Sequence, residues 1–154
     1  MHLDPEQHQM TAIVLAGDRT KADSLIDHSQ AGCKAMIDID GLPMVRRVLN
    51  SLRASRVVNK ICLAGPEESE VATDEPLANW VKDGEVLWSP PESSPSTSAY
   101  RGMQSLDASE AVLLPTADHP LLPPEIVDAF GRQSLADDVD VAVGLAPHAL
   151  VTEA

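Results

Sequence analysis

The sequence predicts a single α/β domain in three layers, α/β/α, with a mostly parallel sheet between the helices. Two observations support this prediction. Short apolar runs, each ended by glycine, proline or polar residues, alternate with segments whose apolar residues recur at helical spacing. The first run is apolar without interruption from Ala12 to Ala16, which is typical of a strand buried on both faces of a parallel sheet. The domain is expected at residues 11–154, after a flexible polar leader at residues 1–10.

Five apolar runs are predicted as strands of the sheet, at residues 11–16, 60–64, 85–88, 111–114 and 140–144. Residues 35–39 are expected to form a small edge strand. Crossover connections in such a sheet are right-handed, and ligands bind beyond the carboxyl ends of its strands. The candidate site is therefore expected among the residues that follow these runs, which are Gly17, Gly65, Ser89 and Asp118.

Helices are predicted between the strands. The clearest begins at Pro43, because the missing N–H of proline would have no partner at the first helical position. It runs to about Ser55, and its apolar face comprises Met44, Val45, Val48, Leu49 and Leu52.

Three further helices are expected. One spans residues 75–82. Another is capped by Thr97 or Ser98 and has on one side Tyr100, Met103 and Leu106. The last starts at Pro123 and has as inward residues Ile126, Val127, Phe130 and Leu135. Residues 67–73 and 89–98 are predicted as polar loops, and the second, rich in proline and serine, is expected to be functional.

The composition limits the partners of the domain. With 24 acidic and 11 basic residues the net charge is −13, so binding to nucleic acid or to an anionic membrane by bulk charge is disfavoured. No apolar run approaches the roughly 18 residues that a membrane span needs, and the polar leader does not resemble a signal peptide. Cys33 and Cys62 lack zinc-site spacing, and two thiols without a disulfide framework suit a reducing cytoplasm.

Lys34 and Asp118 are the candidate chemical residues. Asp118 precedes a turn fixed by proline, where a carboxylate could ligate Mg²⁺ together with substrate phosphates; an ordinary turn or helix cap explains it equally well. Lys34 ends the loop after the first strand and suits a phosphate lysine, although most lysines are solvated surface residues. The chain lacks the GxGxxG and GxxxxGKS/T patterns, and His119 is interpreted as a turn or supporting residue.

Four sequence pieces occur in one order: AIVLAG at 12–17, KAMI at 34–37, GLPMV at 41–45 and DHPLL at 118–122. Together they resemble the nucleotidyltransferase family with the Rossmann-like GT-A-type α/β fold of nucleotide-diphospho-sugar transferases, in its MobA-like, molybdenum-cofactor guanylyltransferase branch. The resemblance covers about residues 11–145. It implies transfer of a nucleoside monophosphate from CTP or GTP to a phosphate or alcohol group of a small acceptor, with release of pyrophosphate.

The resemblance also implies roles for individual residues. Lys34 and Asp118 would be catalytic, and Asp118 would hold Mg²⁺. The residues that would bind the nucleotide are Leu15, Ala16, Gly17, Asp18, Arg19, Lys34, Ser98 and Gly102. Ser98 and Gly102 match a family stretch that would lie near the base.

The sequence departs from the family pattern in two places. Asp18 stands where the family has its second glycine, which puts a negative charge where phosphate is expected. The domain at residues 11–154 is also expected to lack the acceptor-binding part that usually follows the fifth strand in the family. These departures favour an alternative, a degenerate non-catalytic nucleotide-binding or regulatory module of the same fold. A third class, a protein that acts through a homo-oligomeric interface, is left open.

Overall fold

A four-stranded parallel sheet forms the centre of the computed structural model, which describes residues 9–18, 31–137 and 139–146. β1 (Met10–Leu15) pairs with β4 (Val58–Ala64) on one side and with β6 (Ala111–Leu113) on the other. β5 (Leu87–Ser89) extends the sheet beyond β4, so the spatial order is β5-β4-β1-β6. The prediction of a mostly parallel sheet is confirmed.

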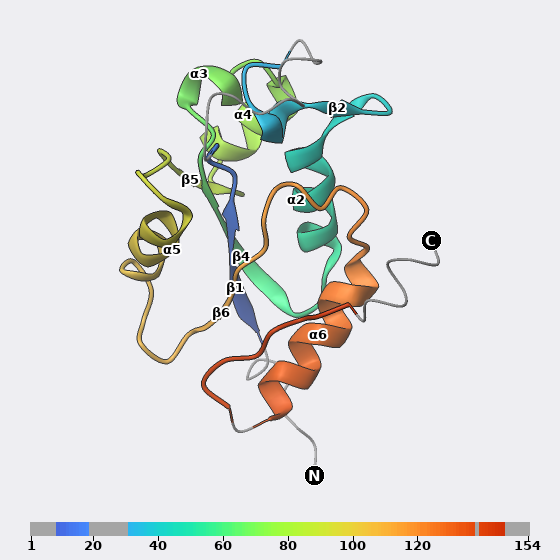
Figure 1. Cartoon of the computed structure of the whole chain (residues 1–154), viewed down its shortest axis with the longest axis vertical. Coiled ribbons are helices and arrows are strands. Elements are labelled where there is room, and N and C mark those ends of the chain that lie inside the picture. The colour runs from blue at the N-terminus through green and yellow to red at the C-terminus, as the bar shows by residue number, and fades with distance from the viewer. Residues whose placement is uncertain (1–8, 19–30, 138, 147–154) are drawn as a thin grey trace.

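Helices cover both faces of this sheet, as Figure 1 shows. α5 (Pro95–Met103) lies on one face against β1 and β4, while α2 (Met44–Ala54) and α6 (Pro124–Ala136) contact each other on the other face. The short helices α3 (Glu68–Val71) and α4 (Glu75–Lys82) lie near the top of the view. This is the predicted three-layer architecture. Within the described residues, none of the helices has the length and apolar character that a membrane crossing requires.

The first strand is buried on both faces, as its uninterrupted apolar run predicts. Ala12 and Val14 are fully buried in the core that α2 covers. Ile13, between them, points to the opposite face, where Gly102 of α5 approaches so closely that a Cβ at this glycine would lie 3.0 Å from the Ile13 side chain. β1 is therefore the central strand of both halves of the core.

The helix α2 has the predicted apolar face, since its buried residues are Met44, Val45, Val48, Leu49 and Leu52. It begins one residue later than predicted, because Pro43 belongs to a small antiparallel pair of β2 (Asp38–Ile39) and β3 (Leu42–Pro43). Only the end of the predicted edge strand at residues 35–39 is thus a strand. Its beginning belongs to a 3-10 turn, Lys34–Met36.

The helix α5 begins earlier than predicted, and the residues that it buries are small. Ser94 is the cap, rather than Thr97 or Ser98, since the Ser94 Oγ accepts the N–H of Thr97 at 3.1 Å. The Tyr100 side chain is 64% exposed, whereas Ser98 and Ala99 are buried. The physical reason is the close approach of α5 to β1, which allows only small residues on the inner side of the helix.

The predicted fifth strand at residues 140–144 is wrong for the structure that is described. Residues 139–146 pair with none of the described strands, and Val141 and Val143 are 77% and 71% exposed. Alternating valines give a segment one apolar side, but a strand also needs a neighbour that satisfies its backbone N–H and C=O groups. No described segment supplies this neighbour beside β6.

Two smaller predictions are also corrected. The polar stretch at residues 67–73 was predicted as a loop, but it contains the helix α3, in which the Val71 side chain is buried. In α6 the predicted Val127 is buried, but Ile126 is 56% exposed and Gly131 takes part in the inner face instead. A Cβ at Gly131 would lie 2.7 Å from the side chain of Val57, so this face of α6 approaches the β4 region closely.

The order of the strands places a crevice at one end of the sheet. From β1 the chain builds β4 and β5 on one side and then returns to β6 on the other side. Ligands of open parallel sheets bind where the order reverses in this way, at the carboxyl ends of the two diverging strands. β1 runs upward in Figure 1, so these ends lie at the top of the molecule.

Candidate active site at the carboxyl ends of the strands

A cavity of about 300 Å³ lies at this reversal of strand order. Its walls come from the end of β1, from the 3-10 turn, from the first residue of α5 and from the segment that follows β6. The lining residues are Leu15, Ala16, Gly17, Asp18, Lys34, Ala35, Pro95, Thr116, Ala117 and Asp118. The structure thus brings together most of the residues that the sequence proposes for a nucleotide site.

Backbone hydrogen bonds align the two strand ends that form the floor of the cavity. The N–H of Leu15 donates to the carbonyl of Pro115 at 2.9 Å, and the N–H of Ala117 donates to the carbonyl of Leu15 at 3.0 Å. The parallel pairing of β1 with β6 therefore continues past the last residue of β6. As a result, Asp118 is held beside the end of β1, where the sequence predicts the site.

Lys34 and Asp118 form an ion pair in the wall of the cavity. The Lys34 ammonium donates to Oδ2 of Asp118 at 2.9 Å, and the Thr116 hydroxyl donates to Oδ1. The hydrogen bond from Lys34, followed by that from Thr116, lowers the pKa of Asp118 to about 2. The carboxylate is therefore ionised at neutral pH. Since the side chains of Lys34 and Asp118 are 31% and 40% exposed, both can be reached by a ligand.

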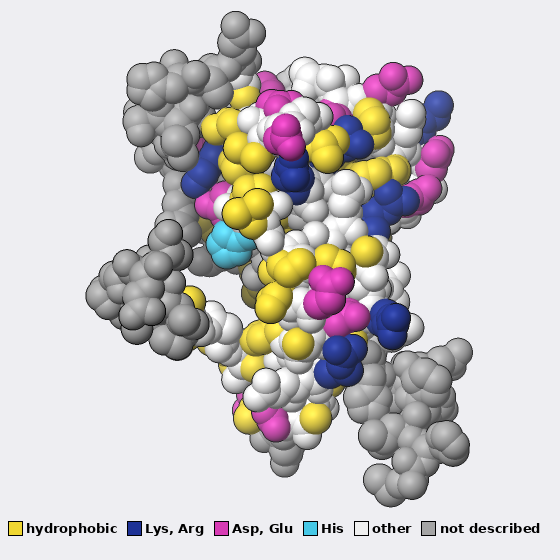
Figure 2. Space-filling view, turned by 90° about the vertical axis from the view of Figure 1, so that its right-hand side faces the viewer, with side chains coloured by type: hydrophobic (Ala, Val, Ile, Leu, Met, Phe, Trp, Pro, Cys, Tyr) yellow, Lys and Arg dark blue, Asp and Glu magenta, His cyan; other side chains and the backbone are white. Residues whose placement is uncertain are grey.

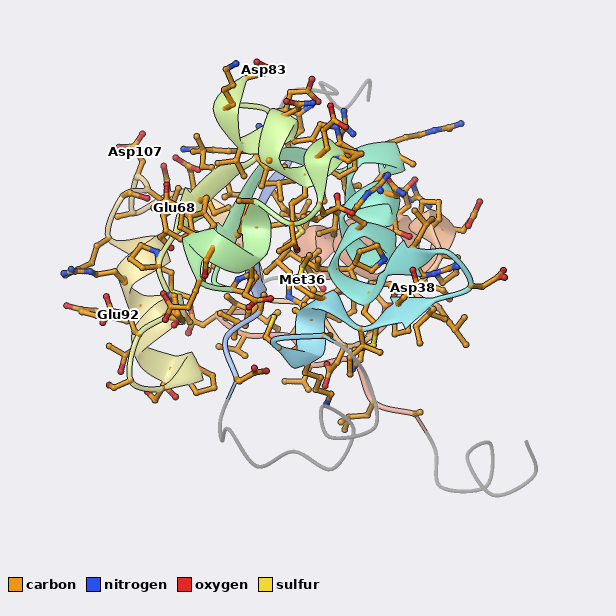
Figure 3. The ribbon with its side chains drawn as sticks, turned by 90° about the horizontal axis from the view of Figure 1, so that it is seen from above. Met36, Asp38, Glu68, Asp83, Glu92 and Asp107 are labelled. Carbon is orange, nitrogen blue, oxygen red and sulfur yellow. The ribbon has the colours of Figure 1, made fainter. Side chains whose placement is uncertain are left out.

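The backbone of Lys34 has its own carboxylate partner. Its N–H donates to Oδ1 of Asp18 at 3.2 Å, which joins the segment that follows β1 to the beginning of the 3-10 turn. Ala35 and Met36 anchor the other side of this turn in the core. Figure 3 shows Met36 near the centre of the molecule when it is viewed from above. Lys34 therefore projects into the cavity from a turn that is fixed at both ends.

Three predicted nucleotide residues lie elsewhere or outside the described part. Ser98 is buried in α5, where its Oγ accepts the N–H of Glu92 at 3.1 Å, and Gly102 lies against Ile13; neither lines the cavity. Arg19 lies outside the described residues. His119 is exposed, with its Nε2 3.8 Å from Asp118 Oδ1.

Thr116 and Pro95 are among the residues of the cavity wall that sequence reasoning missed. Thr116 precedes Asp118 by two positions, and a hydroxyl residue at this spacing is a recognisable turn signal. Pro95 occupies the first position of α5 and brings the start of that helix to the cavity. The Ser-Pro dipeptide at positions 94–95 is the sequence signal that could have found it.

The carboxylates of the cavity suit a hard cation that is shared with a substrate. Asp118 is ionised and faces the cavity, and Asp18 contributes a second carboxylate to the wall. Mg²⁺ is usually bound by one or two carboxylates together with substrate phosphates. Within the described residues, no group of three or more Asp, Glu, His or Cys side chains could hold a metal by itself. The site therefore fits Mg²⁺ as a partner of phosphates and not as a structural ion.

The sequence is similar to those of nucleotidyltransferases. Residues 12–149 match the profile of the MobA-like NTP transferase domain. A relative from Natronomonas pharaonis, named "probable molybdenum cofactor guanylyltransferase", is 29% identical over 138 residues, which are 88% of this chain and 61% of that protein.

Solved structures share the fold at low sequence identity. A hypothetical transferase from Thermus thermophilus has a TM-score of 0.58 at 23% identity, covering 86% of this chain and 48% of its own. The CMP:2-keto-3-deoxy-manno-octonic acid synthetase in complex with CTP has a TM-score of 0.56 at 18% identity, covering 84% and 48%. The 4-diphosphocytidyl-2C-methyl-D-erythritol synthase from Anaerococcus prevotii has a TM-score of 0.62 at 12% identity, covering 94% and 61%.

The chain spans about half to three fifths of the length of these proteins. Its match to the family nevertheless extends over nearly the whole sequence and includes both strand ends of the cavity, with Lys34 and Asp118. The chain belongs to the MobA-like NTP transferase domain family.

Proposed function

We propose that the cavity binds CTP or GTP and that the domain transfers the nucleoside monophosphate to a phosphate or alcohol group of a small acceptor, releasing pyrophosphate. The observation that carries this proposal is the Lys34–Asp118 pair at the β1/β6 end of the sheet, where parallel α/β sheets bind their ligands. Membership in the NTP transferase domain family and sequence similarity to a guanylyltransferase support it.

Lys34 is the residue proposed to bind the triphosphate. Its ammonium is a compact charge on a flexible stem, so it can exchange the Asp118 carboxylate for a phosphate oxygen while its backbone stays in place. There it would stabilise the negative charge that develops on the leaving pyrophosphate. The acceptor oxygen forms its bond to the α-phosphorus as the bond to the bridging oxygen breaks, and pyrophosphate leaves with that electron pair.

Asp118 is proposed to bind Mg²⁺ together with the phosphates. When bound there, Mg²⁺ would supply charge neutralisation for the triphosphate. The Thr116 hydroxyl donates to one oxygen of Asp118 and would keep the carboxylate oriented toward the cavity when Lys34 leaves the other oxygen.

Asp18 favours a second candidate function, a non-catalytic nucleotide-binding or regulatory module. It adds a second carboxylate to a cavity in which Lys34 is the one cation among the described lining residues. Such a wall repels a triphosphate that is not charge-compensated. A module that only binds and releases a nucleotide needs neither an acceptor molecule nor a cavity whose charges stabilise a transition state. Turnover separates the two functions.

We further propose that the partner is a small molecule and that the protein is located in the cytoplasm. On the face that Figure 2 shows, basic side chains are scattered among acidic and apolar ones, which supports a small-molecule partner over nucleic acid.

A cytoplasmic location is inferred from the free thiols Cys33 and Cys62. Burial raises the pKa of both thiols, that of Cys33 to about 11, so they are poorly reactive. Sedimentation velocity would test whether the protein forms a homo-oligomer.

Thermal unfolding with nucleotides tests the binding part of the proposal. A ligand present at a hundred times its Kd stabilises the folded state by about 2.7 kcal/mol, so CTP or GTP with Mg²⁺ should raise the Tm. Lys34→Ala should weaken this binding about tenfold or more, because it removes a charged hydrogen-bond donor to phosphate. The matched control is Lys82→Ala, at an exposed position of α4. An unchanged Tm at millimolar nucleotide would contradict both candidate functions.

Pyrophosphate release tests turnover. It should appear when the nucleotide is offered with a panel of phosphate and alcohol acceptors, and it should disappear in Asp118→Ala. Asp83→Ala is the control, since Asp83 lies at the periphery of the molecule in Figure 3. Nucleotide binding without pyrophosphate release across the panel would favour the non-catalytic module.

A further inference from the structure

Asp18 occupies a position where a negative charge is unexpected for a phosphate site. Its side chain nevertheless has a specific partner, the backbone N–H of Lys34, at 3.2 Å from Oδ1. The two residues are separated by 16 positions in the sequence, and both line the cavity. The carboxylate therefore joins the end of β1 to the residue that supplies the cationic side chain.

The contact satisfies a backbone donor that the chain does not satisfy locally. Lys34 is the first residue of its 3-10 turn, and the first N–H groups of a helical turn have no partner within it. Cys33, at the capping position, makes no side-chain hydrogen bond to the turn. Asp18 supplies an acceptor from a distant part of the chain, in the way that a capping aspartate supplies one from the residue before a helix.

The same segment is also contacted by α3. A Cβ at Gly32 would lie 2.0 Å from Oε1 of Glu70, so the Glu70 side chain of α3 lies directly against the Gly32 backbone. Cys33, the next residue, is buried. The segment that leads into Lys34 is thus contacted by Glu70 at Gly32 and by Asp18 at Lys34.

We propose that Asp18 is a positioning residue, which holds the backbone of Lys34 so that its ammonium lies at the cavity wall before a nucleotide enters. The inference rests on the proposed function, in which Lys34 binds phosphate. When the ammonium exchanges Asp118 for a phosphate oxygen, the Asp18 contact to the N–H is unaffected. Lys34 then changes partner by side-chain rotation alone, and little additional ordering of the chain is needed on binding.

Two substitutions separate positioning from simple charge repulsion. Asp18→Asn keeps an acceptor oxygen of the same reach and removes the charge, whereas Asp18→Ala removes both. If Asp18 positions Lys34, the Ala variant should bind Mg²⁺-CTP or Mg²⁺-GTP roughly five- to tenfold more weakly than the Asn variant, the effect of one lost hydrogen bond. If the carboxylate only repels phosphate, the two variants should bind equally, and this result would overturn the proposal.

A Lys34→Ala background shows whether Asp18 acts through Lys34. This substitution removes the ammonium and keeps the N–H that Asp18 binds, and millimolar nucleotide in a calorimetric titration makes the weaker binding measurable. The ratio between the affinities of the Asp18→Asn and Asp18→Ala variants should then fall to about one. A ratio that stays as large as in the Lys34 protein would mean that Asp18 contacts the ligand directly, against the proposal.

Amide hydrogen exchange tests the positioning contact without any nucleotide. The Lys34 N–H should exchange several times faster in Asp18→Ala than in the wild type and in Asp18→Asn, while amides of the core strand β1 stay protected in all three. Equal exchange of Lys34 in the three proteins would overturn the proposal. Failure of the wild type to bind any nucleotide, with the Lys34 amide still protected by Asp18, would instead refute the proposed function alone.

Discussion

Two clusters of oppositely charged side chains in this domain both pair a basic residue with an aspartate, but their surroundings differ. Between α2 and α4, Arg46 pairs with Asp74 at 3.3 Å, and the two arginines Arg46 and Arg53 lie over the ring of Trp80 at 5.6 and 4.1 Å from its centroid. At the carboxyl end of the sheet, Lys34 pairs with Asp118 on the wall of a cavity. The first group is covered by an aromatic side chain, and the second is open to a ligand.

The difference shows why an ion pair has to be judged by its environment. Arginine stacks on aromatic rings and has a rigid fork of donors, so the α2–α4 group holds two helices together. Lysine has a flexible stem and three rotatable donors, which suits a residue that changes partners. An exposed pair such as Lys34–Asp118 contributes little to folding, and its place at the β1/β6 end of the sheet is the basis of the binding role that we propose for it.

The largest expected effect is on turnover at the cavity pair. Asp118→Ala should reduce the rate of pyrophosphate release by at least about a hundredfold, because it removes the proposed carboxylate ligand of Mg²⁺ and the hydrogen-bond acceptor that Asp118 offers to the Lys34 ammonium. The free energy of unfolding should change by less than about 1 kcal/mol. Steady-state kinetics and urea unfolding measure the two quantities. A stable variant with full activity would exclude Asp118 from the chemistry.

The opposite result is expected in the α2–α4 group. Trp80→Ala should reduce the free energy of unfolding by roughly 2–3 kcal/mol, since it removes a ring that packs on the core and carries both arginines. Nucleotide affinity should be unchanged at temperatures where the variant is folded. The comparison fails if Trp80→Ala weakens binding as much as Lys34→Ala does.

Gly102 extends the comparison to a residue for which the sequence suggests a nucleotide role and the structure shows a packing contact. A Cβ there would lie 3.0 Å from two carbons of Ile13, which is fully buried in the sheet. Gly102→Ala should therefore reduce the free energy of unfolding by about 1–2 kcal/mol, despite the better helix propensity of alanine. Equilibrium unfolding and nucleotide titration decide between the roles: a loss of affinity in a protein of unchanged stability would support the nucleotide role.

The smallest effect concerns pH. The pKa of Asp118 is lowered from 3.8 to about 2 in the folded protein, so its ionised form stabilises the fold at pH values above 3.8. This contribution should be lost as the pH falls from 3.8 toward 2, and it should stay below about 1 kcal/mol because the side chain is 40% exposed.

Asp118→Asn isolates this contribution from other carboxylates that titrate in the same range. The pKa values of Glu110 and Asp128 are also lowered, by hydrogen bonds from Thr11 and Ser55. The stability difference between the wild type and Asp118→Asn should therefore shrink on acidification below pH 3.8. A difference that is independent of pH would mean that the Lys34–Asp118 hydrogen bond does not persist in solution.

The sequence was sufficient to predict the central strands and α2, and several residues that it proposes for the site line the observed cavity. These predictions depend on patterns that are local in the chain: an uninterrupted apolar run for β1, helical spacing for α2, and the position of Lys34 and Asp118 after strands. The Asp18–Lys34 hydrogen bond could not be predicted, because it depends on the three-dimensional course of a segment of 16 positions. Asp18 could be identified in the sequence, but its role as acceptor of the Lys34 N–H could not.

Two features that the sequence pattern did not reveal have a common physical cause. The pattern places the larger residues of α5 on one side, but the helix approaches β1 so closely that small residues face the sheet. Residues 140–144, with Val141 and Val143, were expected to form a strand, yet no described neighbour takes its hydrogen bonds. In both cases the structure depends on a neighbouring element, through the space beside β1 or through a hydrogen-bonding partner for the strand. A local sequence pattern carries no information about that neighbour.

The central claim is that the Lys34 ammonium leaves Asp118 for a nucleotide phosphate. The chain has only four lysines, so the ammonium groups can be followed individually by ¹⁵N NMR, with Lys82 as a reference distant from the cavity. Titration with Mg²⁺-CTP or Mg²⁺-GTP should shift the Lys34 ammonium signal saturably and leave the Lys82 signal in place. A Lys34 signal that stays unchanged at millimolar nucleotide would contradict the account.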